Sequence, residues 1–300
     1  MVNSLGIRAS TYYICLFFPV LMAALSCIAI FFLAKDLGGR AAGLIAAFLM
    51  AINPAFIGRT SLGFYDTENI GIFGMILTSL FFLRSIEEGK KSEYRIIYGV
   101  ASGLSLGYIF ISWGAARYAV GLIGLFIVAT LLICKYDIRI LTWYSLTLGI
   151  GLGIAMMAPR PGVLYPMSIE NLAALALVFV QLAYWQLKDR IDVFTSRITL
   201  GGLLLLVLIV VLVLPMLGVG VPIGGKFLNV INPFRESNNP LFESVAEHRV
   251  AAWTTFFTDF GVALVLGLIA CYFVLTNPEE KKFFGMIFLV TGIYFAGSMS

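Results

Sequence analysis

Two carboxylates stand two residues apart in a polar stretch of an otherwise apolar chain. The stretch reads GRTSLGFYDTENIGIF, and it holds Arg59, Asp66 and Glu68 within ten residues. Carboxylate oxygens are ligands that Mg²⁺ and Mn²⁺ prefer, and a guanidinium pairs with phosphate through its planar fork. The stretch therefore favours a metal and phosphate site. The simpler alternative is a helix N-terminus, in which Asp66 is the cap and Glu68 interacts with the helix dipole.

A second acidic stretch, ESVAEH, lies near the end of residues 218–254, the longest segment without a membrane-spanning pattern. Long loops of this kind tend to carry function. Glu243, Glu247 and His248 precede Trp253 and two phenylalanines, an aromatic group typical of the membrane interface. Glu243 and His248 are most simply solvated loop residues, and we assign them no metal.

The elements that must position these residues are membrane-spanning helices. Hydrophobic residues make up 60% of the 300, charged residues only 12%, and the mean hydropathy is +0.98. Apolar runs alternate with short charged loops, and a helix of about 20 residues spans the hydrocarbon core. We therefore expect an all-α, polytopic membrane protein with about ten transmembrane helices. The expected spans are residues 11–34, 41–57, 70–86, 96–113, 116–134, 140–158, 169–187, 198–217, 255–275 and 283–298.

The distribution of basic residues predicts the orientation. Thirteen of the 20 lysines and arginines fall in the loops of one side, which the positive-inside rule assigns to the cytoplasm. The Arg59 stretch and the 218–254 loop then both face outward, because an even number of spans separates them. This makes a multi-pass cell-membrane protein with extracytoplasmic acidic loops. The sequence has no basic patch interleaved with aromatics, so we expect no nucleic-acid partner.

The two acidic stretches together resemble motifs of the catalytic subunit of oligosaccharyltransferase, in its archaeal form. RTSLGFYDTE, Arg59 to Glu68, is similar to the motif in which an arginine stands seven residues before an Asp-x-Asp/Glu pair. ESVAEH is similar to the later Ser-Val-Ser-Glu motif, with Ala246 replacing the second serine. The resemblance covers essentially all 300 residues. It implies a membrane glycosyltransferase-C type fold and one multispan catalytic domain over residues 1–300.

The resemblance also implies a reaction and roles. An oligosaccharide would move from a polyprenyl (dolichyl) phosphate or diphosphate to the asparagine of an Asn-x-Ser/Thr sequence in an acceptor polypeptide. Asp66 and Glu68 would hold Mn²⁺ or Mg²⁺, and Arg59 would bind phosphate as a catalytic residue. Glu247 would bind the acceptor peptide and activate its amide nitrogen. The family's first acidic loop and C-terminal soluble domain do not occur among the 300 residues. We therefore expect the middle of a longer enzyme, inactive alone.

Two other functions fit parts of the pattern. Another membrane glycosyltransferase that uses a polyprenyl-phosphate sugar would share the architecture, but such enzymes place key acids in the first outward loop. A multispan transporter could line a vestibule with the same acids. The expected spans, however, have no ionisable residue at the midplane and no convincing inverted repeat, features that transporters often have.

Overall fold

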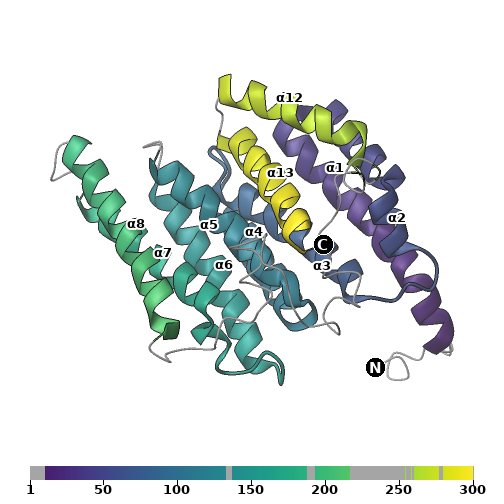
Figure 1. Cartoon of the computed structure of the whole chain (residues 1–300), viewed down its shortest axis with the longest axis horizontal. Coiled ribbons are helices and arrows are strands. Elements are labelled where there is room, and N and C mark those ends of the chain that lie inside the picture. Colours follow the sequence, from purple (N-terminus) through teal and green to yellow (C-terminus); the bar gives the residue numbers. More distant parts are fainter. Residues whose placement is uncertain are drawn as a thin grey trace.

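The computed structural model describes residues 11–132, 137–187, 193–216, 260–276 and 280–299, together with Thr254 and Thr258. Over these residues the chain is helical and contains no strand, which confirms the all-α fold (Figure 1). The α-helices are α1 (Thr11–Ile52), α2 (Pro54–Thr60), α3 (Thr67–Ile86), α4 (Ser92–Ser112), α5 (Arg117–Leu132), α6 (Ile138–Met157), α7 (Ile169–Leu187), α8 (Val193–Met216), α12 (Val262–Thr276) and α13 (Glu280–Met299). Two 3₁₀ turns, Gly114–Ala116 and Tyr165–Met167, lie in the connections.

The helices agree with the expected membrane spans. Within the described residues six helices are long and apolar enough to cross a membrane, namely α1, α3, α4, α6 and α7 together with the stretch Gly114–Leu132 that contains α5. Shorter apolar segments lie in α8, α12 and α13. The first two expected spans are joined in α1, which is interrupted at Gly38 and Gly39. The polytopic membrane fold is therefore confirmed.

The interruption in α1 reverses the chain. Gly39 has a φ of 85°, a conformation that glycine adopts without a Cβ clash. A Cβ added to Gly43 would lie 2.7 Å from the carbonyl oxygen of Phe31, twelve residues earlier. Residues that far apart in one straight helix are about 18 Å apart. The two arms of α1 therefore fold back on each other, as two separate spans require.

The second arm breaks at Asn53, where α2 begins. The Asn53 side chain accepts a hydrogen bond of 3.0 Å from the Phe56 amide, and Pro54 occupies the first helical position. Both residues are typical of a helix start. The short helix α2 brings the chain to Arg59 and then to the polar stretch before α3.

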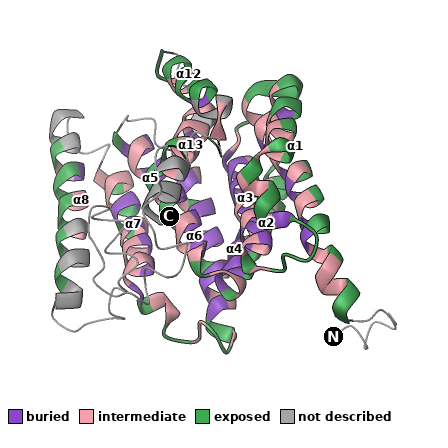
Figure 2. Ribbon diagram, turned by 45° about the vertical axis from the view of Figure 1, so that its right-hand side comes forward, coloured by how far each residue is buried: buried purple, intermediate pink, exposed green. Residues whose placement is uncertain are grey.

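The buried core lies in the middle of the helix array. Buried residues concentrate on α3, α4, α5 and α6, whereas the described side chains of α8 and much of α1 are mostly exposed or half-buried (Figure 2). The rings of Phe82, Phe126 and Phe284 are fully buried, and the Phe126 ring contacts the other two, with centroids 6.4 Å from Phe82 and 5.1 Å from Phe284. Exposed leucines, isoleucines and phenylalanines cover the outer helices, as a lipid environment allows.

Close packing joins α4 to α6. A Cβ on Gly103 would lie 2.7 Å from Ile150 Cβ, and one on Gly107 would lie 2.6 Å from Ile154 Cδ1. Gly99 faces Trp143 in the same way. The four-residue spacing of these glycines is a packing device for close helix approach. This packing fixes the position of α4. It therefore also fixes the loop after α4, which lies beside α3.

Charged residues gather at the two ends of the bundle. At the end formed by the α3–α4 connection, Arg84 contacts Asp36 at 2.6 Å and lies between the rings of Phe32 and Tyr98. Arg139 pairs there with Glu88 and Asp137. We call this the Arg84 end. The opposite end, where α3 begins, is the Asp66 end and holds the candidate site.

Candidate functional site

The polar stretch between α2 and α3 is tied to the start of α1. The Gly63 amide donates a hydrogen bond of 3.0 Å to the carbonyl oxygen of Leu16, and Gly63 has a φ of 84°. The ring of Tyr65 contacts that of Phe18, with centroids 5.3 Å apart. These contacts hold the turn against the bundle. The turn then places Asp66 directly before Thr67, the first residue of α3.

Asp66 caps α3, so the helix-cap interpretation is confirmed for this residue. Its backbone is extended (φ −131°, ψ 161°), and its Oδ1 accepts from the Thr67 amide at 2.6 Å and the Thr67 hydroxyl at 3.3 Å. Both bonds use the same oxygen. The other carboxylate oxygen of Asp66, Oδ2, takes part in neither of these two hydrogen bonds. Capping therefore occupies one carboxylate oxygen and leaves the other as a metal ligand candidate.

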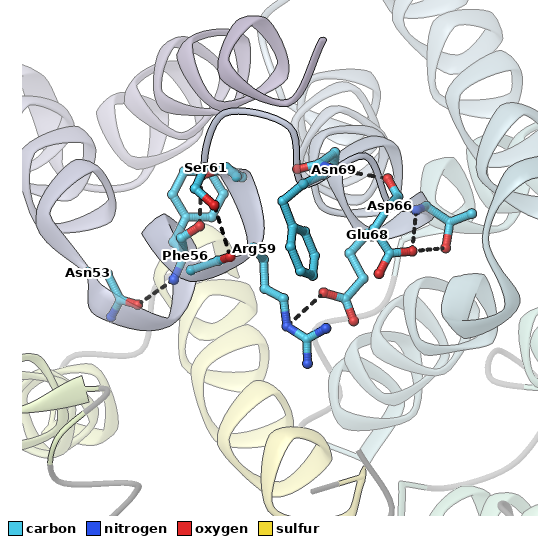
Figure 3. A network of polar contacts seen from close by, with 11 residues as sticks. Asn53, Phe56, Arg59, Ser61, Asp66, Glu68 and Asn69 are labelled. Carbon is cyan, nitrogen blue, oxygen red and sulfur yellow. Dashed lines mark hydrogen bonds and ion pairs between the residues drawn. The ribbon is translucent and has the colours of Figure 1, made fainter. Parts of the chain in front are cut away.

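Glu68 lies in the first turn of α3 and pairs with Arg59 at the end of α2. Arg59 Nε is 3.3 Å from Glu68 Oε2, and the guanidinium lies 5.8 Å from the ring centre of Phe64 (Figure 3). The two side chains are 38% and 28% exposed, so an ion in solution can reach them. The sequence suggested separate roles for Arg59 and Glu68. The structure brings them into one ion pair at the same helix end.

The donor set fits a hard divalent cation in part. Asp66 at the cap and Glu68 in the first turn of one helix supply carboxylate oxygens, which suit Mg²⁺ or Mn²⁺. No group of three His, Cys, Asp or Glu side chains that could hold a metal occurs among the described residues. The remaining ligands must come from water, from a bound phosphate or from residues beyond the described ranges. These two carboxylates alone therefore do not complete a metal site.

A tryptophan that packs against the first part of α3 was missed by sequence reasoning. Trp113 follows α4 and lies directly over Gly71, one turn into α3, where a Cβ would be 2.2 Å from Trp113 Cδ2. Gly71 therefore makes room for the indole next to the Glu68 turn. The sequence signal was available, because an aromatic and a glycine (Trp113-Gly114) end the fourth span. No pattern linked it to α3.

A second polar cluster at the same end was also missed. Arg117 Nε lies 2.7 Å from Glu170 Oε1, joining the start of α5 to the first turn of α7. The neighbouring Tyr165 packs its ring against Phe110, with centroids 5.1 Å apart. Burial raises the pKa of Tyr165, and the Arg117 charge opposes that effect. The cluster resembles the Arg59–Glu68 pair but has no second acid.

The other predicted site residue, Glu247, lies outside the described residues, as do Glu243 and His248. Whether the 218–254 loop meets Asp66 and Glu68 therefore remains a prediction. The described candidate site consists of Arg59 on α2, Asp66 at the cap of α3 and Glu68 in its first turn, with Trp113 lying over Gly71 one turn into α3.

Known proteins resemble this chain over essentially its whole length. The family model "Oligosaccharyl transferase STT3, N-terminal" matches residues 4–300. The chain is 28% identical to dolichyl-diphosphooligosaccharide–protein glycosyltransferase subunit STT3A of Oryza sativa subsp. japonica over 314 residues, which is 100% of the chain and 39% of the relative. It is 26% identical to subunit stt-3 of Caenorhabditis elegans over 310 residues, covering 100% of the chain and 40% of the relative. The chain thus spans about two fifths of these relatives.

Solved structures share the fold. An archaeal oligosaccharyltransferase, AglB of Archaeoglobus fulgidus, in complex with an inhibitory peptide and a dolichol-phosphate, superposes with a TM-score of 0.71 at 19% identity, over 99% of this chain and 38% of that one. The A. fulgidus enzyme in complex with Zn and sulfate gives a TM-score of 0.66 at 20% identity over the same shares. A third structure, tethered to an acceptor peptide containing the NVT sequon, gives 0.68 at 20% identity, over 99% of this chain and 37% of that one.

Proposed function

Because the chain belongs to the oligosaccharyl transferase STT3 family, we propose that it forms the membrane part of a protein N-glycosylation enzyme. The enzyme transfers an oligosaccharide from a polyprenyl phosphate or diphosphate to the asparagine of an Asn-x-Ser/Thr sequence. One observation carries the proposal: Arg59, Asp66 and Glu68 gather at the start of α3, where Arg59 lies 3.3 Å from Glu68. That cluster combines phosphate-binding and metal-binding side chains at one end of the bundle.

Ligands of the structural neighbours support the choice of substrates. The A. fulgidus structures contain a dolichol-phosphate, an acceptor peptide with the NVT sequon, and Zn with sulfate. A lipid phosphate, an asparagine peptide and a divalent cation are the partners that the proposed reaction requires. We propose the same classes for this chain, with Mn²⁺ or Mg²⁺ at Asp66 and Glu68.

In this proposal Asp66 and Glu68 hold the cation that acts on the leaving group. When bound, the divalent cation supplies Lewis-acid stabilisation of the negative charge that grows on the phosphate. Asp66 offers the oxygen that the cap does not use, and Glu68 adds a second carboxylate from the same helix turn. Arg59 lies within ion-pair distance of Glu68, so its guanidinium can contact a phosphate that approaches this pair. The α3 N-terminus favours the negative charge of the two carboxylates and of an approaching phosphate.

Glu247 acts on the acceptor. The asparagine nitrogen is a poor nucleophile because its lone pair is delocalised into the carbonyl. A carboxylate that accepts hydrogen bonds from the NH₂ group orients the nitrogen and weakens that delocalisation. The nitrogen forms its bond to the sugar carbon as the bond from that carbon to the phosphate oxygen breaks, and one N–H proton passes to the Glu247 carboxylate that held it. In this proposal Glu247 reaches the Asp66 end from the 218–254 loop.

The Asp66 end faces outward in this proposal, because most lysines and arginines lie in the loops of the Arg84 end. We expect a cysteine introduced at Ser61 to react with a membrane-impermeant maleimide in intact cells. A cysteine introduced at Ser92 should react only after the membrane is opened. Both serines are exposed, so accessibility within the protein is matched. If only the Ser92 variant is labelled in intact cells, the protein has the opposite orientation and the prediction is wrong.

The activity itself is tested on the full-length protein that contains this chain, in membranes supplied with a lipid-linked oligosaccharide. We expect mass spectrometry to find glycan on a peptide with an Asn-x-Thr sequence and none on the matched Gln-x-Thr peptide. Chelation of divalent cations should abolish the product, and Mn²⁺ should restore it. Transfer of a single sugar from a polyprenyl-phosphate monosaccharide, with no oligosaccharide transfer, would favour the other glycosyltransferase class instead.

A further inference from the structure

One buried amide connects the polar turn to the helix that carries both acids. Asn69 is the third residue of α3 and is only 1% exposed. Its Nδ2 donates hydrogen bonds to two backbone carbonyl oxygens, that of Phe64 at 3.0 Å and that of Asp66 at 3.2 Å. These carbonyls lie before the helix, whereas Asn69 lies within it. A single side chain therefore fastens the end of the turn to the first turn of α3.

The fastening sets the directions of both carboxylates. Asn69 holds the carbonyl of Phe64, two residues before Asp66, and also the carbonyl of Asp66 itself. The extended backbone of Asp66 is therefore fixed at two points. Glu68 directly precedes Asn69 in the helix and points toward Arg59 (Figure 3). If the amide is lost, the Phe64 carbonyl loses this partner and the turn can shift against α3. The spacing between the Asp66 and Glu68 oxygens would then vary.

The other half of the Asn69 amide gives no such benefit. Its Oδ1 is buried and has no hydrogen-bond partner among the described residues. A buried unpaired acceptor destabilises the folded state. Leucine has a similar volume and no such acceptor, so stability alone gives little reason for an amide here. The two bonds that Nδ2 donates are the contribution that leucine cannot replace.

The fold repeats this arrangement at α7, without the acid pair. Asn171 is the third residue of α7, is fully buried and donates from Nδ2 to the carbonyl oxygen of Tyr165 at 3.0 Å. Its Oδ1 also lacks a partner among the described residues. Glu170 precedes it and pairs with Arg117, as Glu68 pairs with Arg59. Ser168, however, occupies the place that Asp66 has before α3. Asn171 is therefore a built-in control for Asn69.

We propose that Asn69 is a positioning residue that holds Asp66 and Glu68 at the separation a shared divalent cation requires. The inference rests on the metal role proposed above. It assigns Asn69 no contact with substrate or metal. Residues that orient metal ligands in this way typically change metal affinity by about 10- to 100-fold when they are replaced.

The test compares Asn69→Leu with Asn171→Leu in the full-length protein. The affinity for Mn²⁺ is measured from the electron paramagnetic resonance signal of free Mn²⁺, and thermal unfolding is followed in parallel. We expect Asn69→Leu to weaken Mn²⁺ binding at least about tenfold. The Mn²⁺ affinity of Asn171→Leu should stay within about twofold of the parent. Its melting temperature should change by about as much as that of Asn69→Leu. Should Asn69→Leu fail to fold, Asn69→Ser serves, because its short hydroxyl cannot reach both carbonyls.

Hydrogen exchange of the turn separates this inference from the metal proposal. Without added metal, backbone amides between Phe64 and Glu68 should exchange faster in the Asn69 variant than in the parent. Parental exchange together with parental Mn²⁺ affinity would overturn the positioning role. If Mn²⁺ binding by the parent does not depend on Asp66 or Glu68, the metal proposal fails. In that case faster exchange still supports the fastening role of Asn69, and unchanged exchange refutes it.

Discussion

Replacement of Glu247 by glutamine should lower the turnover of glycan transfer at least about a hundredfold, within the range lost when a preorganised electrostatic contact is removed. Glutamine keeps the size of the side chain but replaces a charged acceptor with a neutral amide. Hydrogen bonds to charged acceptors are about twice as strong as those to neutral ones. The lost bond bears on the transition state, where the acceptor nitrogen is activated. Affinity for the lipid-linked donor should therefore change little.

The measurement is peptide glycosylation by the Glu247→Gln variant across a Mn²⁺ titration, with Glu243→Gln as the matched control from the same loop. Glu243→Gln should stay within about threefold of the parent, as expected for a solvent-facing acid. If Glu247 mainly positions the metal, excess Mn²⁺ will restore much of the rate to its variant. If Glu247 is only a solvated loop acid, both variants will have near-parental turnover, and the assignment of Glu247 to the acceptor would be wrong.

Replacement of Asp66 or Glu68 by alanine should weaken Mn²⁺ binding more than about a hundredfold, because loss of an outer-shell partner alone costs 10- to 100-fold. Each variant removes one of the two carboxylates at the start of α3. Asp66→Ala also removes the α3 cap, which lowers stability by about 1 kcal/mol. Asp66→Asn is the sharper variant, because asparagine caps helices well but carries no charge.

Glu170→Ala is the matched control for Glu68→Ala. Both glutamates are the second residue of a helix and pair with an arginine, at 2.7 and 3.3 Å respectively. Glu170 has no neighbouring aspartate at the helix start, so its loss should leave Mn²⁺ affinity within about twofold of the parent. Equal losses from the two alanine variants would mean that an ion pair at this end, rather than the Asp66–Glu68 pair, supports binding. Unchanged binding in both acid variants would leave only the cap role of Asp66.

The helices could be predicted from the sequence because the hydrocarbon core imposes one length and one composition on each span. The expected 70–86 and 169–187 spans correspond to α3 and α7 within a few residues. The polar residues at the helix starts, such as the cap residue Asp66, could also be predicted, since a cap lies directly before its helix. The break at Asn53 was not predicted, because the expected second span continued to residue 57 through Pro54.

Contacts between distant segments could not be read in advance. The placement of Trp113 over Gly71 depends on how α4 packs, and that packing depends on glycines that face α6. The pairing of Arg117 with Glu170 joins residues 53 positions apart, with nothing local to connect them. No sequence pattern singled out Asn69. Its role depends on burial and on two carbonyls, neither of which the sequence displays.

The central claim is that Asp66 and Glu68 hold a divalent cation that the phosphate of the lipid carrier joins. Pulsed electron paramagnetic resonance of Mn²⁺ bound to the full-length protein tests this directly, because phosphorus within bonding distance of the metal gives a ³¹P coupling. We predict that polyprenyl phosphate will produce this coupling in the parent and that Asp66→Asn will abolish it. Mn²⁺ bound as tightly to Asp66→Asn as to the parent, with no ³¹P coupling in either, would contradict the account.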